Sequence, residues 1–213
     1  MLFDTHAHYD DDQFDPDREA LLASLPERGV GLVVNPGCTV ASSRTAVELA
    51  HRFPHIYAAV GIHPENCGDF RPEHLTEIRA LAQEDKVVAI GEIGLDYYWP
   101  ENPPRDLQQQ VLRQQLALAQ ELQLPVIIHD RDAHADTMDI VREFPRVRGV
   151  FHCFAGSVEM ARELVDRGWY LSFNGAATFK NARKAPDDLR GLAGDDRDGR
   201  PLPDPGALSG PPQ

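Results

Sequence analysis

The apolar residues of the chain fall into seven short runs, and longer segments of mixed apolar and polar residues separate them. Short runs rich in Val, Ile and Leu are typical of parallel strands that are buried on both faces. The expected strands are Leu2–Thr5, Leu32–Asn35, Ile56–Ile62, Val87–Ile93, Pro125–His129, Gly149–His152 and Trp169–Phe173.

The segments between these runs carry leucine, alanine and charged residues at three- and four-residue spacing, which predicts amphipathic helices. The expected helices are Arg18–Arg28, Ser42–Arg52, Pro72–Glu84, Leu107–Leu122, Ala135–Glu143 and Val158–Asp166. In Leu107–Leu122 we expect the leucines to face the core and the glutamines to lie on the opposite side. Repeated strand and helix units predict an α/β fold, and about seven of them favour a TIM-type (β/α) barrel over an open sheet.

The character of the sequence changes at Asp187. Residues 187–213 hold five prolines, five glycines and six aspartates, without a run that could form a strand or an amphipathic helix. This composition predicts a disordered tail after a barrel domain of residues 1–186. Because a closed eight-stranded barrel takes about 250 residues, we expect this barrel to be incomplete, with about seven strands.

Composition narrows the function classes. The chain has 213 residues, of which 42% are hydrophobic and 26% are charged, as in an ordinary soluble protein. No apolar run approaches the roughly 20 residues of a membrane span, and the N-terminus lacks a secretory signal pattern, so we predict a cytoplasmic protein without a membrane partner. The net charge of −13 gives no basic surface for a polyanion, so a nucleic-acid substrate would require bound cations.

The three cysteines are odd in number and lack the paired spacing of a zinc finger. We therefore expect reduced thiols without a disulfide framework. The sequence gives no sign of an obligate protein partner.

Histidines or a carboxylate follow five of the seven predicted strands. The chemistry of a barrel of parallel strands is placed at the carboxyl ends of the strands. His6 and His8 follow the first strand, His63 the third, Glu92 the fourth, His129 the fifth and His152 the sixth.

Their residue types and placement predict a metal site. Residues two apart on a strand point to the same side, so His6 and His8 can hold one ion. His129 and His152, from neighbouring strands, can hold a second, and Glu92 can bridge the two. Two divalent cations about 4 Å apart, whether zinc, magnesium or manganese, lower the pKa of a bridging water and stabilise charge on a phosphate or carbonyl oxygen.

Each residue also has a simpler interpretation when taken alone. The His6/His8 pair could cap a strand, Glu92 could form a buried ion pair with Arg131, and His129 and His152 could be histidines of the core. Their coincidence at successive strand ends favours metal binding. Four other histidines lack such a placement and are expected at the surface: His51, His55, His74 and His134.

Further residues at the same rim are candidates for substrate contacts. His63 could contact a phosphate group, and Arg131 could hold one through two parallel hydrogen bonds. Asp96, Tyr97 and Lys180 are secondary candidates. Asp4 shares the direction of His6 and His8 but lies one step deeper, so we expect it to orient a ligand rather than to bind metal.

Several stretches together resemble the TatD family of metal-dependent deoxyribonucleases. They are DTHAHYDD with FDPDR, GIHP, GEIGLDYY, LPVIIHDRDA, GVFHCFAGS and LSFNGAATFKNARK, which run in order from Met1 to about Pro186. The resemblance implies a TIM-type barrel that hydrolyses phosphodiester bonds, with 3′ to 5′ exonuclease action on DNA. We predict that the DNA substrate is single-stranded. It also implies His6, His8, Glu92, His129 and His152 as metal ligands, with Glu92 bridging and therefore catalytic.

The sequence departs from the family after the FKNA segment. The family continues with an ETD-type motif whose aspartate completes the first metal site, and nothing here resembles it. The aspartates of the tail follow no strand, so none is assigned this role. One hypothesis is a shift of reading frame or an incorrectly assigned end of the gene. Resequencing that finds the motif in another frame would support it, and full-length protein in cells ending at Gln213 would contradict it.

Three functions remain open from the sequence. The leading one is a metal-dependent hydrolase of the TatD type. The second is a truncated protein that binds metal without turnover. The third is an amidohydrolase acting on C–N bonds, for which a modified lysine usually replaces Glu92; Lys86 lies before the fourth strand rather than at its end.

Overall fold

Seven parallel strands lie side by side in one sheet, in the same order as in the chain. The computed structural model describes residues 1–174. The strands are β1 (Leu2–Asp4), β2 (Val30–Pro36), β3 (Ile56–Val60), β4 (Val87–Asp96), β5 (Val126–Arg131), β6 (Gly149–Phe151) and β7 (Tyr170–Leu171). All seven predicted strands are confirmed, and the largest difference is that β4 continues three residues past the predicted end at Ile93.

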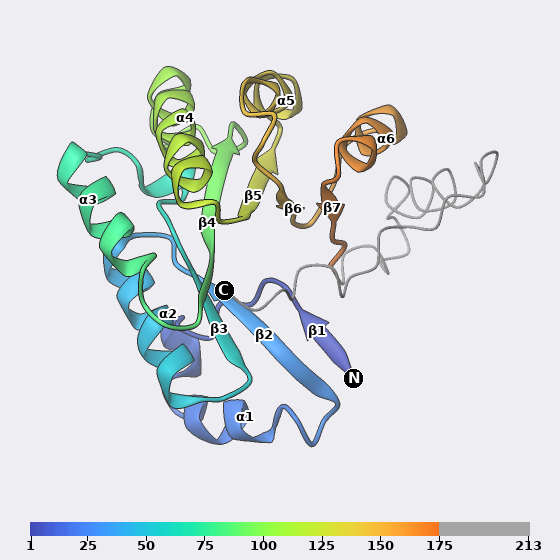
Figure 1. Ribbon diagram of the computed structural model, residues 1–213. Helices are drawn as coiled ribbons and strands as arrows, with labels where there is room; N and C mark the ends of the chain where they lie inside the picture. The colour runs from blue at the N-terminus through green and yellow to red at the C-terminus, as the bar shows by residue number, and fades with distance from the viewer. Residues whose placement is uncertain (175–213) are drawn as a thin grey trace.

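Helices connect the strands and cover the outer face of the curved sheet (Figure 1). They are α1 (Arg18–Ser24), α2 (Val40–Arg52), α3 (Pro72–Leu81), α4 (Arg105–Leu122), α5 (His134–Glu143) and α6 (Val158–Asp166), with short 3₁₀ turns η1 (Asp12–Phe14) and η2 (Pro64–Asn66). The curvature confirms the predicted incomplete TIM-type barrel, and within residues 1–174 it forms a half-barrel.

Local sequence explains where the predicted helix ends were inaccurate. Thr39 and Ser42 form a reciprocal capping box, which starts α2 two residues before the predicted Ser42. Helix α1 ends at Ser24, four residues before the predicted end, because Pro26 has no backbone N–H with which to continue the helical hydrogen bonds.

Two apolar clusters pack on opposite faces of the sheet. The large one lies between the strands and the helices and includes fully buried Leu22, Ile90, Leu116 and Ile128. The small one takes one residue from each of β2 to β5 and faces the inside of the half-barrel: Val34, Ala59, Ala89 and Ile127. Because side chains alternate along a strand, His129 and Arg131 leave β5 on the same face as Ile127.

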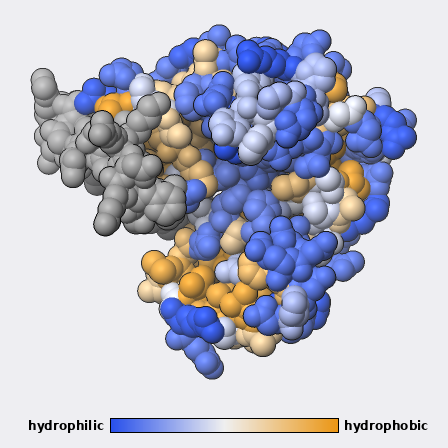
Figure 2. Space-filling model, turned by 180° about the vertical axis from the view of Figure 1, so that it is seen from behind, coloured by the Kyte–Doolittle hydropathy of each residue, from blue (hydrophilic) through white to orange (hydrophobic). Residues whose placement is uncertain are grey.

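Strand β1 is an edge of the described sheet, since it pairs only with β2. Its side chains are unusually exposed for their type: Leu2 is 68% exposed and Phe3 58%. Hydrophobic side chains gather on the lower part of the molecule, where Figure 1 places β1 and β2 (Figure 2). An apolar edge of this kind is where a closed barrel would continue its pairing.

Other expectations have mixed outcomes. His55 was expected at the surface, and this is wrong: it is 9% exposed and its Nε2 lies 2.9 Å from the Leu22 carbonyl oxygen. The three cysteines are free thiols. Across residues 1–174, no helix has the combination of length and apolar character needed to cross a bilayer. Lys180 and the predicted tail at 187–213 lie outside the described residues.

Candidate metal centre

The Glu92 carboxylate stands at the centre of the mouth of the half-barrel, and only 3% of the residue is exposed. Strand β4 carries it, and the residue that directly follows β2 holds its backbone: the Glu92 N–H donates to the Gly37 carbonyl at 2.9 Å. Each of its two oxygens faces a different group of imidazoles. We call these groups the Oε2 half and the Oε1 half.

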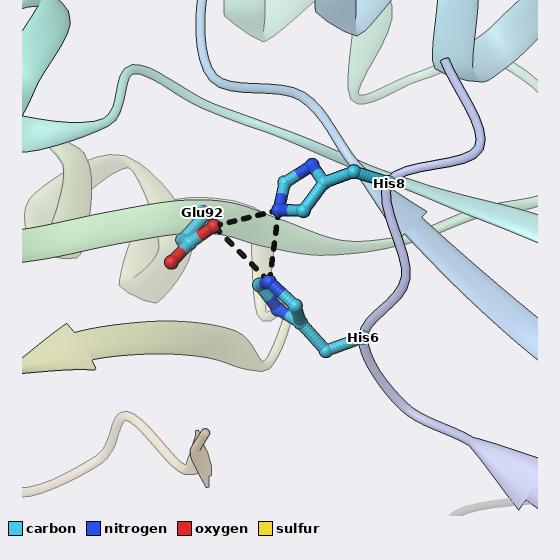
Figure 3. Close-up of side chains that lie close together, drawn as sticks. All are labelled: His6, His8 and Glu92. Carbon is cyan, nitrogen blue, oxygen red and sulfur yellow. Dashed lines mark hydrogen bonds and ion pairs between the residues drawn. The ribbon is translucent and has the colours of Figure 1, made fainter. Parts of the chain in front are cut away.

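The Oε2 half consists of His6 and His8, which follow β1. Both Nε2 atoms lie 3.2 Å from Glu92 Oε2 and 2.9 Å from each other. Figure 3 shows the two rings and the carboxylate pointing toward one common place. The segment is held by the Ala7 N–H, which donates to the Val34 carbonyl at 3.2 Å, and by the His6 N–H, which donates to Asp4 Oδ1 at 3.1 Å.

The Oε1 half consists of His63, His129 and His152. The distances to Glu92 Oε1 are 2.6 Å from His152 Nε2, 2.9 Å from His129 Nδ1 and 3.5 Å from His63 Nε2. His129 belongs to β5, and His152 directly follows β6, where its N–H donates to the Ile128 carbonyl at 3.1 Å. The close approach of β4 to β5 requires glycine at position 94, because a Cβ there would lie 1.9 Å from the His129 carbonyl oxygen.

The curvature of the sheet joins the two halves. The rings of His6 and His152 stack with their centroids 3.8 Å apart and an interplanar angle of 3°. The strands that precede them, β1 and β6, are separated in the sheet by four others. A flat sheet would hold them far apart, so the stack depends on the barrel-like curl.

Buried carboxylates orient the histidines unequally in the two halves. Asp96, fully buried at the end of β4, has Oδ2 2.9 Å from His129 Nε2, which turns His129 Nδ1 toward Glu92. In the Oε2 half, Asp10 Oδ1 lies 3.8 Å from His8 Nδ1 and is held by a 2.8 Å hydrogen bond from Asn35. Carboxylates that hold the second nitrogen of a ligating imidazole are a regular feature of metal sites.

Two glutamines of α4 fix the backbone around the site. Gln108 donates to the Asp96 carbonyl and accepts from the Asp96 N–H, and Gln115 does the same for Ile62, which precedes His63. The expectation that these glutamines lie on the exposed side of the helix is therefore wrong for Gln108 and Gln115. They are buried because the irregular strand ends present backbone groups that no neighbouring strand satisfies.

The electrostatics keep the central carboxylate ionised. Burial alone would raise the pKa of Glu92, but hydrogen bonds from His129, His152 and His6 hold it well below the ordinary value. Burial likewise opposes protonation of His129, yet Asp96 and Glu92 raise its pKa to about 9. The ionised Glu92 carboxylate thus favours positive charge beside it.

The donor set fits divalent metal ions. Two clusters have ligand atoms within 4.8 Å of one another: His6, His8 and Glu92 form one, and His63, Glu92 and His129 form the other. Imidazole nitrogens around a shared carboxylate suit zinc and other first-row divalent ions. The side-chain Nδ1 atoms of His6 and His152 are buried without a hydrogen-bond partner within residues 1–174, so the stacking of the two rings and their Nε2 contacts hold them in place.

The structure brings together all five predicted ligands, and it adds His63 to them. Arg131, predicted with His63 to contact substrate, does not reach Glu92; its guanidinium lies over the Tyr98 ring. Lys86, the residue considered for an amidohydrolase, bonds to the carbonyls of Ala50 and Phe53, away from the centre. Sequence reasoning missed Asp10 and Asn35, although Asp10 follows His8 by two residues and so shares its spacing.

Comparison with known proteins agrees with this geometry. The model of the family described as TatD related DNase matches residues 3–196 of the chain. The chain belongs to this family. It is therefore a metal-dependent hydrolase of the TatD family.

Two curated relatives show how the TatD family is named. The chain is 43% identical over 197 residues to the uncharacterized metal-dependent hydrolase YabD of Bacillus subtilis, covering 92% of this chain and 77% of that protein. It is 36% identical over 176 residues to the 3′-5′ ssDNA/RNA exonuclease TatD of Cronobacter sakazakii, covering 82% and 66%. The chain thus spans two thirds to three quarters of their lengths.

A solved TatD-family structure has the same fold. The crystal structure of YjjV, a TatD homologue from Escherichia coli, superposes with a TM-score of 0.81 at 34% sequence identity. The match covers 88% of this chain and 73% of that chain. Family and fold are therefore supported by independent comparisons of sequence and structure.

Proposed function

We propose that this TatD-family protein hydrolyses phosphodiester bonds of single-stranded DNA from the 3′ end, with two divalent cations. The observation that carries the proposal is the Glu92 carboxylate, each of whose oxygens faces its own group of histidines. One carboxylate shared in this way suits a bridged pair of ions. The name of the Cronobacter relative supports nucleic acid as the substrate.

When bound, the cations would supply Lewis acidity, which makes water a nucleophile at neutral pH and stabilises charge on the phosphate oxygens. The residues of the chain have separate tasks around them. His6 and His8 would hold one ion, His129 and His152 the other, and Glu92 both. His63, 6% exposed at the edge of the Oε1 half, would contact the phosphate or complete that half.

A direct test uses the purified chain with a 5′-labelled single-stranded oligonucleotide in Mg²⁺, Mn²⁺ or Zn²⁺. We expect products shortened one nucleotide at a time, and loss of this activity in Glu92→Ala. The matched control is Glu73→Ala, which removes an exposed carboxylate in the first turn of α3. Hydrolysis that persists in Glu92→Ala, or no hydrolysis by the metal-loaded chain, would contradict the proposal.

A second candidate is a protein that binds metal without turnover. The observation that favours it is the composition of the Oε2 half, which within residues 1–174 has two histidines and one carboxylate oxygen. A metal site with three protein ligands is common, but the resemblance implies a further aspartate here. Stoichiometric metal binding with no nucleotide release in the same assay would favour this second function.

A further inference from the structure

Two aromatic side chains stand exposed beside the metal centre, just beyond the end of β4. Tyr98 is 48% exposed and Trp99 is 42% exposed. Their rings meet edge to face, with centroids 4.6 Å apart at 87°. Among residues 1–174 the other large hydrophobic side chains with comparable exposure are Met1, Leu2, Phe3 and Leu32, at the β1 edge. The pair is therefore separate from the unfinished edge of the barrel.

A cation lies over the Tyr98 ring and close to that of Trp99. The guanidinium carbon of Arg131 is 3.9 Å from the centre of the Tyr98 ring and 5.3 Å from that of Trp99. Within residues 1–174 no carboxylate forms an ion pair with Arg131, so its N–H groups remain available to an anion. An arginine that stacks on an aromatic ring can still present its planar edge to a phosphate.

The aromatic pair is tied directly to the metal centre. The Tyr98 N–H donates to Asp96 Oδ1 at 3.0 Å, and Asp96 Oδ2 holds His129 at 2.9 Å. Arg131 lies two residues beyond His129 on β5, on the same face, so their backbones are about 7 Å apart. The rings and the guanidinium thus follow the same ends of β4 and β5 that carry Glu92 and His129.

Hydrogen bonds order the backbone that carries Tyr98, Trp99 and Arg131. Asn102 donates through its side chain to Asp96 and through its backbone to the Trp99 carbonyl. The Tyr97 N–H donates to the Arg131 carbonyl at 2.9 Å, which joins the end of β4 to that of β5. A surface that is already ordered loses little entropy when a ligand binds to it.

The chemistry of these three side chains suits an unpaired nucleobase. Stacking on an exposed aromatic side chain contributes roughly 1–3 kcal/mol per base and requires a base outside a duplex. The chain as a whole carries a net charge of −13 and so cannot attract nucleic acid by a broad basic surface. A stacking site with a single arginine would supply local affinity that the overall charge does not.

We propose that Tyr98, Trp99 and Arg131 form a subsite that stacks one base of a single-stranded nucleic acid while Arg131 contacts its phosphate. The inference rests on the proposed function for its class of substrate. It changes the expected role of Arg131, which acts together with the rings instead of as an isolated clamp.

Binding can be measured with the metal-loaded protein and a labelled oligothymidine whose phosphorothioate linkages resist hydrolysis. Fluorescence anisotropy should show about tenfold weaker binding for Trp99→Ala and for Tyr98→Ala, and near wild-type binding for Trp99→Phe. Phe3→Ala, which removes an exposed ring from the β1 edge, is the matched control and should bind normally. Wild-type affinity in both alanine variants would overturn the inference.

An abasic oligonucleotide of the same length separates stacking from phosphate contacts. It should bind wild type, Tyr98→Ala and Trp99→Ala equally and weakly, because it has no base to stack. An equal loss of affinity for the abasic and the thymidine oligomer in these variants would refute a stacking role. In wild type the exposed Trp99 should be quenched by oligothymidine, whereas Trp169, 3% exposed, should not respond.

The two proposals can fail separately. If oligothymidine binding depends on Trp99 but no hydrolysis is seen with any metal, the subsite is supported and the nuclease proposal is contradicted. If hydrolysis depends on Glu92 but KM is unchanged in Tyr98→Ala and Trp99→Ala, the nuclease proposal is supported and the subsite is contradicted.

Discussion

The two halves of the candidate metal centre share one carboxylate but have different structural support. The histidines of the Oε1 half come from strands that have a neighbour on each side, and the side chains of His63 and His152 are 7% and 8% exposed. Those of the Oε2 half follow the edge strand β1, and the side chain of His8 is 34% exposed. The histidines of the Oε1 half are therefore held by strands inside the sheet, whereas those of the Oε2 half follow a strand at the edge of the described sheet.

The difference follows from the pairing of the strands in the described sheet. Strands β4, β5 and β6 pair directly with one another and carry Glu92, His129 and, just past β6, His152. Within residues 1–174, strand β1, which precedes His6 and His8, pairs with β2 alone. We expect the Oε1 half to be the stronger and better ordered of the two.

The largest expected effect is on metal content. His8→Ala and His129→Ala should each lower the affinity for one of two ions by more than about 100-fold, because even partners that only orient a ligand contribute 10–100-fold. His129→Ala should also lower the free energy of unfolding by about 1–3 kcal/mol, since it leaves the buried Asp96 without that partner. Metal analysis after dialysis and urea unfolding measure the two effects.

The exposed His51→Ala provides the control for both measurements. If His8→Ala lost both ions and His129→Ala neither, the assignment of the stronger half would be reversed.

A smaller effect is expected from the carboxylates that orient the rings. Asp96→Asn should weaken binding of one ion about 10–100-fold, because Asp96 fixes His129 at 2.9 Å. Asp10→Asn should weaken the other by less than about tenfold, since Asp10 lies 3.8 Å from His8. Isothermal titration with Zn²⁺ compares the two variants, and equal losses would mean that the two halves are oriented equally well.

The smallest expected effect concerns local stability in the unmodified protein. Backbone amides of β1 should exchange with deuterium at least about tenfold faster than those of β4, because an edge strand opens without disrupting the core. Hydrogen exchange followed by mass spectrometry resolves Leu2–Asp4 from Val87–Asp96. Equal protection of the two segments would show that β1 is covered in solution.

Much of the site follows from the sequence because parallel strands bring their carboxyl ends together. His6, Glu92 and His129 could each be predicted from the end of an apolar run. The division between Oε1 and Oε2 could not, because it depends on the curl that stacks His6 on His152.

Other parts escaped prediction for local reasons. The apolar pattern of β4 weakens after Ile93, so the strand appeared to end before Asp96. It nevertheless pairs with β5 as far as Asp96, whose own N–H and carbonyl bond to the side chain of buried Gln108. The sequence around His55 suggested a surface residue, but its ring is buried and forms a hydrogen bond with the backbone carbonyl of Leu22. In both cases a side chain satisfies backbone groups, which periodicity does not reveal.

The positions of the ligands along the chain also set an order of events during folding. In the Oε1 half, His129 is 37 residues from Glu92 and 23 from His152, whereas His8 is 84 residues from Glu92. Closing longer loops costs more entropy, so contacts within β4 to β6 should form before the first-synthesised histidines reach Glu92. The residues that leave the ribosome first would thus be the last to reach their places in the site.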